Sequence, residues 1–491
     1  MKAPVDIGLG LDRVLSATGG ALVRPSKVTA EKFSAVVIDG REVPRGALFF
    51  AIQGDRFDGH DFVAQAVAGG ADGVVVARGR GAQAIASTPA SFAVVEVDDP
   101  IAALGKLARA HRESMSELKV VGIAGSNGKT TTKEITAAIL RAAAGEDAVL
   151  KTEGNLNNHL GVPLTLLRLS PRHRFAVVEM GMSALGELSY LASIGRPDVA
   201  VIVSIADEHL EHLGSIENVA RAEAEILEAV VERGQAVVPV DEPLLAPYVT
   251  RVPAERRLTF GPRAAGATCG IEDVTPRADG LTFSLHLRGL TSRSGVQAHL
   301  PLVGAHNASN AAAAAAAALA LDVGEGPILD GMEHVKPAKH RAQLVAAGDR
   351  TVLDDCYNAS PLSMRAALDA LDALARAAAA PEHKRVAVLG DMLELGPDAP
   401  RLHAELGAYA AARVDQLIAF GPLSRALADA ARERLGADRV LHTDDPHDAA
   451  ERALAASGPG DVILVKASRG MRLERVIDLI VGSFAAARGG G

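Results

Sequence analysis

A glycine-rich turn with a lysine is the strongest chemical signal in this sequence. The run GSNGKTTT at 125–132 follows an apolar segment and precedes a helical pattern. Glycines let backbone N–H groups turn toward phosphate oxygens, and the helix N-terminus adds its positive dipole. Lys129 would neutralise the β- and γ-phosphates, and the Thr130 hydroxyl could bind Mg²⁺. Ile123 breaks the usual G-x-x-x-x-G-K-[ST] spacing, yet GKT at a strand-to-helix junction favours a phosphate loop made of Gly125, Ser126, Asn127, Gly128, Lys129, Thr130 and Thr131.

Further segments place polar side chains where ligands are often bound. Glu179 ends the apolar run of VVEMGMS at 177–183, and His209 opens HLEHLGS at 209–215. Asn307 and Asn310 lie in GAHNASN at 304–310, and DDCYNASP occupies 354–361. Taken singly, each has a plain structural explanation: a strand-end carboxylate, a surface histidine, a helix cap with its neighbour. Their interpretation therefore depends on their joint occurrence.

Length and composition limit the class of protein. At 491 residues the chain exceeds one hydrophobic core, and at about 150 residues per domain we expect three domains. A formal charge of −9 and a pI near 5.9 argue against nucleic-acid or anionic-membrane binding, which needs a basic surface. Cys269 and Cys356 are the two cysteines, so no disulfide framework is expected.

No targeting or membrane-spanning segment is expected either. Asp6, Asp12 and Arg13 interrupt the region where a signal peptide needs an apolar core. The longest apolar stretch, at 311–321, is too short to cross a bilayer. We therefore expect a cytoplasmic protein with no nucleic-acid partner and no membrane insertion.

The elements around the glycine-rich turn indicate how it is positioned. Strands are predicted at 47–52, 73–77 and 92–97 and a helix at 61–68, as in a small α/β domain. A helical pattern from Ile101 leads to a predicted strand at 119–124, the turn, and a helix from Lys129. The turn thus falls at the carboxyl end of a strand, where open α/β sheets bind ligands.

The middle of the chain continues this pattern and then changes. Strands are predicted at 175–180 and 199–205, followed by a helix from about Ile216 to Glu232. Between Arg257 and Val303, short alternating runs such as LTFSLHL indicate an antiparallel sheet appended to the parallel one. An alanine-rich helix at about 307–321 closes this part, and the Gly/Pro punctuation at 324–327 marks the next boundary.

From Thr351 onward, apolar runs such as RVAVLG and DVILVK alternate with helical stretches, as in a doubly wound, Rossmann-like domain. The tail FAAARGGG should be disordered. The predicted fold class is therefore α/β with three domains. These are a small α/β domain at 1–99, a central P-loop domain with a mainly parallel sheet plus a small antiparallel sheet at 100–325, and a Rossmann-like domain at 326–491.

The shortened phosphate loop and the later segments, in this order, resemble the Mur ligase family and the related folylpolyglutamate synthetases over nearly the whole chain. The resemblance implies that ATP and Mg²⁺ are bound, with Thr130 and Glu179 on one Mg²⁺ and His209 helping to hold a second. Further nucleotide-binding residues are implied in the later segments: Asn307, Asn310, Arg341 and Asp355.

Two features resemble the branch of the family that adds D-Ala-D-Ala: GDMLELG at 390–396, and Asn358 where relatives tend to carry His. The segment containing Asp39 and Arg41 resembles a uridine-nucleotide domain that folylpolyglutamate synthetases lack. The implied substrate-binding residues are Asp39, Arg41, Asn155, Asn157, Asn158, Asn358, Lys466, Ser468 and Arg469. For the asparagines of the GNLNN turn and for the KASRG run, an ordinary turn and an ordinary strand end are alternative explanations.

The resemblance implies an ATP-dependent ligase whose partners are its two substrates, UDP-MurNAc-tripeptide and D-Ala-D-Ala. The tripeptide carboxylate would become an acyl phosphate, which the amine of the dipeptide attacks. The residues expected to act in catalysis are Lys129, Glu179, His209 and Glu223. We expect a monomer.

Three positions depart from the family pattern. Gly40 stands where Ser or Thr is usual, and His340 stands before Arg341 where Gly is common. Glu223 replaces a lysine that many relatives carbamylate to obtain a carboxylate for Mg²⁺. Glu223 could reach Mg²⁺ through a water, or it could face solvent on the helix expected from about Ile216 to Glu232.

Two alternative functions stay open at this point. One is the related ligase that adds the third residue of the stem peptide. The other is a catalytically silent member that binds nucleotide, suggested by the missing lysine at position 223. Retention of Lys129, Thr130, Glu179 and His209 argues against the silent member.

Overall fold

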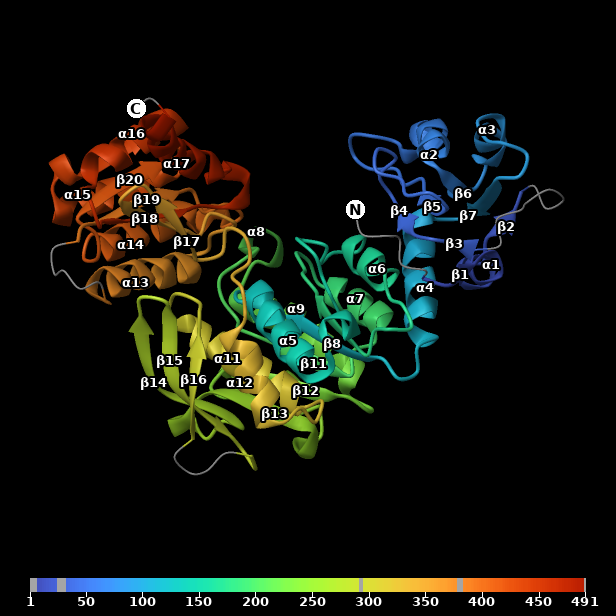
Figure 1. The fold of residues 1–491 in the computed structure, drawn as a ribbon, viewed down its shortest axis with the longest axis horizontal. Coiled ribbons are helices and arrows are strands. Elements are labelled where there is room, and N and C mark those ends of the chain that lie inside the picture. The colour runs from blue at the N-terminus through green and yellow to red at the C-terminus, as the bar shows by residue number, and fades with distance from the viewer. Residues whose placement is uncertain (1–6, 24–31, 291–294, 378–382, 490–491) are drawn as a thin grey trace.

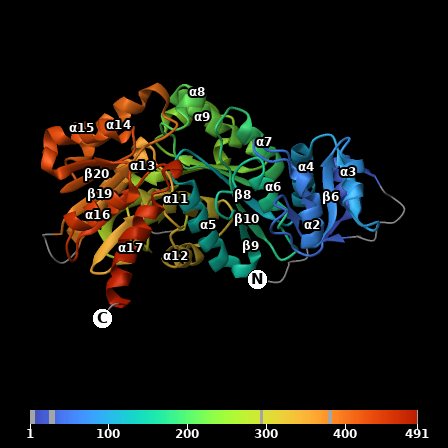
Figure 2. The same cartoon turned by 90° about the horizontal axis from the view of Figure 1, so that it is seen from above.

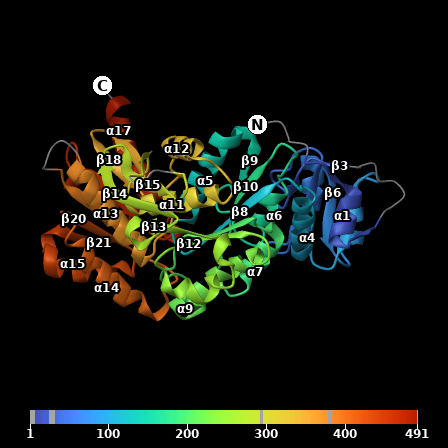
Figure 3. The same ribbon diagram turned by 90° about the horizontal axis from the view of Figure 1, so that it is seen from below.

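The computed structural model describes residues 7–23, 32–290, 295–377 and 383–489. Three α/β units follow one another along the chain, and the N-terminal and C-terminal units lie on either side of the central one (Figure 1). The same order is seen from above and from below (Figures 2 and 3). The predicted three-domain α/β class is confirmed.

The N-terminal unit is built on a small, mainly parallel sheet with the order β2-β7-β6-β5-β4. Its strands are β2 (Ala21–Leu22), β4 (Val36–Val37), β5 (Ala47–Phe50), β6 (Ala71–Ala77) and β7 (Ala93–Val97). The helices are α1 (Leu11–Thr18), α2 (Val63–Gly69) and α3 (Gly81–Ala86), and β1 (Leu9–Gly10) pairs with β3 (Lys32–Phe33). Helix α4 (Pro100–Glu113), capped by Asp99, leads from this unit to the central one.

The central unit contains the longest sheet, with the order β16-β15-β14-β13-β12-β11-β8-β10-β9. The strands up to the turn and beyond it are β8 (Lys119–Ala124), β9 (Val149–Lys151), β10 (Phe175–Glu179), β11 (Val199–Ile202) and β12 (Gln235–Pro239). The chain fills one side of β8 with β9 and β10 and the other side with β11 and β12, so the strand order reverses at β8. Ligands bind beyond the carboxyl ends of strands at such a switch point.

The segment from Arg257 to Val303 differs from its prediction in part. It forms β13 (Arg257–Pro262), β14 (Cys269–Arg277), β15 (Gly280–Leu287) and β16 (Val296–Leu300). β13 and β14 continue the parallel pairing, and antiparallel pairing begins between β14 and β15. The antiparallel strands β15 and β16 therefore belong to the same sheet, because β15 pairs with the last parallel strand, β14, and β16 pairs with β15.

Helices cover both faces of the central sheet. α5 (Lys129–Ala144), α11 (His306–Leu319) and α12 (Glu325–Glu333) share one core, and α4, α6 (Gly161–Leu166), α7 (Glu187–Gly195) and α9 (Ile216–Ala224) share the other. The alanines at 311–318 are all buried, since small side chains let α11 approach the sheet closely. The central domain was expected to end at residue 325, where α12 begins. α12 nevertheless packs against α5, and Ile328, Met332 and Val335 lie in the core that α5 and α11 share. We infer that the central unit extends to Val335.

The C-terminal unit has the sheet order β17-β18-β22-β19-β20-β21. Its strands are β17 (Gln343–Ala347), β18 (Arg350–Asp354), β19 (Arg385–Gly390), β20 (Gln416–Phe420), β21 (Val440–Thr443) and β22 (Val462–Lys466), parallel except for β17. Helices α13 (Pro361–Ala377), α14 (Ala399–Ala410) and α15 (Ser424–Leu435) cover one face, and α16 (Pro446–Ala456) and α17 (Glu474–Gly489) cover the other.

The C-terminal tail corrects one expectation. The residues from Phe484 onward, expected to be disordered, continue α17 as far as Gly489; residues 490–491 lie outside the described part. No helix within the described ranges is long and apolar enough to cross a membrane.

Candidate active site

A cavity of about 970 Å³ lies between the central and C-terminal units. Its walls contain the glycine-rich loop, the ends of β10 and β11, the start of α11, and C-terminal segments around Asp355, Leu393 and Lys466. These segments are far apart in the sequence, and the sheet ends bring them together. The arrangement is that of a ligand site shared by two domains.

The glycine-rich loop connects β8 directly to α5, as predicted. Gly125 has φ +121° and Gly128 has φ +87°, and a Cβ on either would collide with neighbouring atoms at 2.7 and 2.3 Å. The loop is held by the segment after β11: Ser126 N–H donates to the Ser204 carbonyl (2.8 Å), and Asn127 N–H donates to the Ser204 hydroxyl (2.9 Å). These bonds hold the loop in place, and the first N–H groups of α5, which have no acceptor within the helix, are left for an anion.

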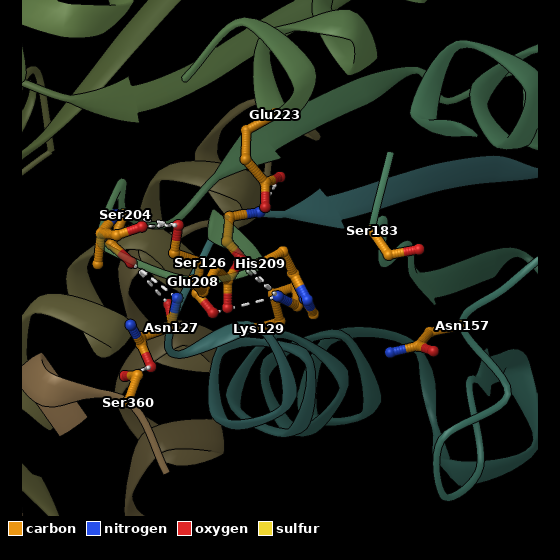
Figure 4. Close-up of polar contacts among 12 residues, drawn as sticks. Ser126, Asn127, Lys129, Asn157, Ser183, Ser204, Glu208, His209, Glu223 and Ser360 are labelled. Carbon is orange, nitrogen blue, oxygen red and sulfur yellow. Dashed lines mark hydrogen bonds and ion pairs between the residues drawn. The ribbon is translucent and has the colours of Figure 1, made fainter. Parts of the chain in front are cut away.

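Lys129 bends back over this loop. Its ammonium donates to the carbonyl oxygens of Gly125 and Ser126 and lies 3.7 Å from Glu208 Oε1. Figure 4 shows the lysine and Glu208 joined by a dashed line. Burial opposes the ammonium, but three carboxylates, those of Glu208, Glu223 and Glu179, outweigh it and raise the pKa of Lys129. The lysine is charged at neutral pH and is suited to bind phosphate oxygens.

Glu223 does not face solvent, so that alternative is wrong. Helix α9 ends at Ala224 and a 3₁₀ segment follows from Glu225 to Val230, in place of the single helix expected to Glu232. Glu223 is 1% exposed and accepts a hydrogen bond of 2.6 Å from Gly125 N–H. Burial raises the pKa of its carboxyl despite Lys129 and this hydrogen bond. Its carboxylate lies behind the loop and is not among the residues that line the cavity.

Glu208 is a site residue that sequence reasoning missed. It precedes His209 in the loop after β11, lines the cavity, and its side chain is 14% exposed. Burial raises its pKa to about 8, against the ammonium of Lys129. An acidic residue beside the selected histidine, after a predicted strand, was the available signal.

Glu179 ends β10 beside the loop, as expected from its motif. Its Oε1 accepts hydrogen bonds from the Thr130 hydroxyl (3.2 Å) and the Asn157 amide (3.0 Å). Its Oε2 lies 3.5 Å from Lys133 Nζ and has no hydrogen-bond partner among the described residues. Lys133 was also missed, although it lies one helical turn after Lys129 on α5.

His209 lies at the domain interface. It adopts φ +52°, and its Nδ1 is 2.7 Å from Oε2 of Glu394, a C-terminal residue that also has a positive φ of +64°. Burial lowers the pKa of His209. A neutral imidazole is the form that binds metals.

The start of α11 contributes two amides to the cavity. The Asn307 side chain donates to the Val303 carbonyl (2.7 Å), and Asn310 donates to the Asn307 side-chain oxygen (2.8 Å). Both residues are buried and line the cavity. Their fixed orientation suits contact with a flat polar ligand near the loop.

The C-terminal unit supplies a second group of charged residues. Lys466 Nζ donates to Asp355 Oδ2 (2.6 Å) and to the Asn358 carbonyl (2.9 Å). The guanidinium groups of Arg341 and Arg469 lie 4.1 and 5.7 Å from the centre of the Tyr357 ring. Tyr357 was not singled out from the sequence, although it belongs to the DDCYNASP motif.

The remaining expected site residues divide into three groups. Asn155, Asn157 and Asn158 line the cavity, and Asn158 also accepts hydrogen bonds from the backbone at the start of α6. Ser468 lines it too, and its hydroxyl accepts a hydrogen bond from Leu393 N–H (2.9 Å). Asp39 and Arg41 form an exposed ion pair in the N-terminal unit, away from this cavity.

The donor set fits a triphosphate with a hard cation. Glu179 Oε2, which faces Lys133 but accepts no hydrogen bond from the described residues, and the Thr130 hydroxyl are oxygen ligands of the kind that Mg²⁺ prefers. A ready-made cluster of three ligand atoms occurs, among the described residues, at His340, Asp354 and Cys356 rather than here. A cation at Glu179 would therefore complete its shell with phosphate oxygens and water, as Mg²⁺ commonly does.

The first prediction concerns Glu223 as an anchor of the loop. Glu223→Ala should lower the free energy of unfolding by about 1–3 kcal/mol, because Gly125 N–H loses its buried acceptor, and should lower kcat through the loosened loop. Glu223→Gln keeps an acceptor oxygen and should lose less. Denaturant unfolding and steady-state kinetics measure both effects.

Bicarbonate provides the control for this role. We expect no effect of added bicarbonate on the wild type or on Glu223→Ala. Unchanged stability and rate in Glu223→Ala would contradict the anchor, and rescue of Glu223→Lys by bicarbonate would instead support a metal-binding role for this position.

Comparisons with known proteins agree with this geometry. Three family models match: the Mur ligase family catalytic domain at 32–112, the Mur ligase middle domain at 123–318, and the Mur ligase glutamate ligase domain at 340–469. The chain is 36% identical to a UDP-N-acetylmuramoyl-tripeptide–D-alanyl-D-alanine ligase of Bacillus subtilis, with 91% of this chain and 93% of that protein covered. It is 35% identical to the protein of the same name from Escherichia coli, with 90% and 92% covered.

Solved structures give the same result. The fold is similar to that of MurF from Acinetobacter baumannii, with a TM-score of 0.83, 31% identity, and 96% and 98% of the two chains covered. It is also similar to MurF ligase from Thermotoga maritima in complex with ADP, with a TM-score of 0.78, 29% identity, and 92% and 98% covered.

Proposed function

The chain belongs to the Mur ligase family, and we propose that it uses ATP to join D-Ala-D-Ala to UDP-MurNAc-tripeptide. The observation that carries the proposal is the cavity in which the phosphate loop, the Glu179 carboxylate and the C-terminal charged residues meet. The names of relatives that match over nearly the whole chain supply the substrates.

The reaction follows from the chemistry of a carboxylate, which is a poor electrophile. Transfer of the γ-phosphoryl group of ATP to the tripeptide carboxylate gives an acyl phosphate, and the dipeptide amine then displaces phosphate through a tetrahedral intermediate. The N–H groups at the start of α5 and the Lys129 ammonium bind the phosphates and balance charge as the phosphoryl group moves, which is mainly positioning and electrostatics. Asn307 and Asn310 orient the nucleotide from the start of α11.

Thr130, Glu179 and His209 are the residues that would hold Mg²⁺. When bound, Mg²⁺ neutralises phosphate charge and polarises the transferred group. The Asn157 amide donates a hydrogen bond of 3.0 Å to Glu179 Oε1, the same oxygen that accepts from Thr130, so this carboxylate is oriented in advance.

The C-terminal unit excludes water from the acyl phosphate. It already contacts the loop, since the Ser360 hydroxyl donates to Asn127 Oδ1 (3.1 Å), and it meets His209 through Glu394 (2.7 Å). Lys466, Ser468 and Arg469 lie on the cavity wall of this unit and are proposed to bind the nucleotide or dipeptide together with Asp355, Arg341 and Asn358. Exclusion of water protects the intermediate from hydrolysis.

The uridine nucleotide is assigned to the N-terminal unit. Asp39 and Arg41 are exposed there, with side chains 45% and 77% accessible, so a bound uridine nucleotide could contact them. The peptide part of the same substrate would extend from there to the cavity and be bound by Asn155 and Asn158. Use of ATP and a uridine nucleotide supports a cytoplasmic reaction. A monomer suffices, because residues of one chain line the cavity.

Amine-dependent phosphate release tests the function. Purified protein with ATP, Mg²⁺ and UDP-MurNAc-tripeptide should release phosphate when D-Ala-D-Ala is added and not with D-Ala, lysine or meso-diaminopimelate. The reason is that the dipeptide amine is the proposed nucleophile.

The dipeptide-linked nucleotide is the matched control substrate. Turnover with UDP-MurNAc-dipeptide and lysine or meso-diaminopimelate would identify the ligase for the third residue instead. Nucleotide binding without phosphate release for any amine would identify a silent member.

A further inference from the structure

We propose that Glu208 is a further metal-binding carboxylate of the phosphoryl-transfer site, which releases Lys129 when a nucleotide binds and is then available to a second magnesium ion. The inference rests on the proposed function, because it requires a triphosphate at the glycine-rich loop.

Glu208 is a half-buried carboxylate that lines the cavity, and its Oε1 is inaccessible to solvent. Its Oε1 accepts no hydrogen bond from the described residues, and its ion-pair partner is Lys129 at 3.7 Å. The adjacent residue, His209, lines the same cavity. Figure 4 shows the side chains of Glu208 and His209 beside Lys129.

Lys129 must change partners when phosphates arrive. Its ammonium now donates to the loop carbonyls of Gly125 and Ser126, and contact with a triphosphate requires it to turn toward the phosphate oxygens. The Lys129 ammonium, the ion-pair partner of Glu208, then also binds the triphosphate, which carries more negative charge than Glu208. An uncompensated carboxylate in this partly enclosed position is strongly unfavourable, so Glu208 must either bind a new cation or take up a proton.

No other cationic side chain in the described part of the chain is paired with Glu208. Among the other cations that line the cavity, Lys466 pairs with Asp355 and Arg469 with Glu474, whereas Arg341 stacks on Tyr357 and, like Lys336, forms no ion pair with Glu208. A divalent cation that arrives with the triphosphate meets this need, since hard cations bind carboxylate and phosphate oxygens together. The adjacent imidazole of His209 offers it a second protein ligand.

Glu223 is less suited to this role, although it is also close to Lys129. Its carboxylate is occupied by Gly125 N–H at 2.6 Å and lies outside the cavity wall. The two glutamates therefore have different tasks: the buried Glu223 holds the loop from behind, and the half-buried Glu208 faces the ligand.

Counting bound manganese ions tests the proposal without turnover. The full chain is titrated with Mn²⁺ in the presence of the non-hydrolysable analogue AMP-PNP, and free Mn²⁺ is measured by electron paramagnetic resonance. We expect two bound ions in the wild type. Glu208→Gln, which keeps the shape and removes the charge, should weaken the second ion about 10-fold or more and leave the first, at Thr130 and Glu179, unchanged.

Glu211→Gln is the matched control, because Glu211 follows three residues later, is exposed, and does not line the cavity; it should bind both ions like the wild type.

Should Glu208→Gln fold poorly in a thermal melt, Glu208→Asp keeps the charge on a shorter stem and should give intermediate affinity for the second ion. Wild-type binding of both ions by Glu208→Gln would overturn the proposal, as would nucleotide-linked proton uptake that depends on Glu208 while both ions are retained.

Failure of this inference is distinguishable from failure of the proposed function. If the wild type binds two ions in a Glu208-dependent way but none of the amines supports phosphate release, the metal-binding role of Glu208 stands and the proposed ligase activity is wrong. If the wild type turns over D-Ala-D-Ala but binds a single ion, the proposed ligase activity stands and the metal-binding role of Glu208 is wrong.

Discussion

Lys129→Ala should lower kcat on the order of 10³-fold, comparable to the loss of one preorganised electrostatic stabiliser. The ammonium lies at the loop within reach of both loop carbonyls and Glu208, and it stays charged because the surrounding carboxylates raise its pKa. The positive charge of Lys129 stabilises the transition state in which the phosphoryl group passes from ATP to the tripeptide carboxylate, so the effect should appear in kcat more than in KM.

The measurement is steady-state phosphate release at saturating ATP and both peptide substrates. Lys119→Ala is the matched control, since Lys119 is exposed at the opposite end of β8, and it should retain wild-type kinetics. Near-normal kcat in Lys129→Ala would show that the loop does not bind the reacting phosphates.

Glu179→Gln should raise the Mg²⁺ concentration for half-maximal rate by about 10- to 100-fold, the range found when the surroundings of a metal ligand are altered. Glutamine can keep the hydrogen bonds from Thr130 and Asn157 but offers no negative charge to a hard cation. Lys133 retains Glu134 as a partner at 3.3 Å, so the fold should persist.

Rates measured across a Mg²⁺ titration at fixed ATP give this value directly. Glu232→Gln, at an exposed position, should leave it unchanged. His209→Ala should shift it in the same direction but less, because a neutral imidazole contributes no net charge. An unaltered Mg²⁺ requirement in Glu179→Gln would remove Glu179 from the metal site.

Much of the reactive centre was predictable because its parts are set by short stretches of chain. The glycine-rich turn, the strand before it and the helix after it are neighbours in sequence, so pattern and turn chemistry predict their geometry. Glu179 and the loop then meet because β10 and β8 are parallel neighbours, with Glu179 opposite Ile123. A carboxylate at a strand end and a turn at a strand end share the same edge of the sheet.

Other features were outside the reach of such patterns. An apolar alternation predicts a strand but not its partner, which is why β13 and β14 were expected to be antiparallel and are parallel. Charged side chains on a helix suggest solvent exposure, which is why Glu223 appeared able to face water. Its burial depends on the end of α9 at Ala224 and on the Gly125 N–H that it accepts.

The sequence by itself determined the three-domain α/β class, the glycine-rich turn between a strand and a helix, and the carboxylate and histidine beyond the neighbouring strands. Only the tertiary structure decided that Glu208 faces Lys129, that Glu223 supports the loop from behind, and that Glu394 meets His209 across two domains. The physical reason is distance along the chain: local propensity specifies a strand, a turn or a helix, whereas contacts between remote segments depend on how whole elements pack and on which buried charges must then find partners.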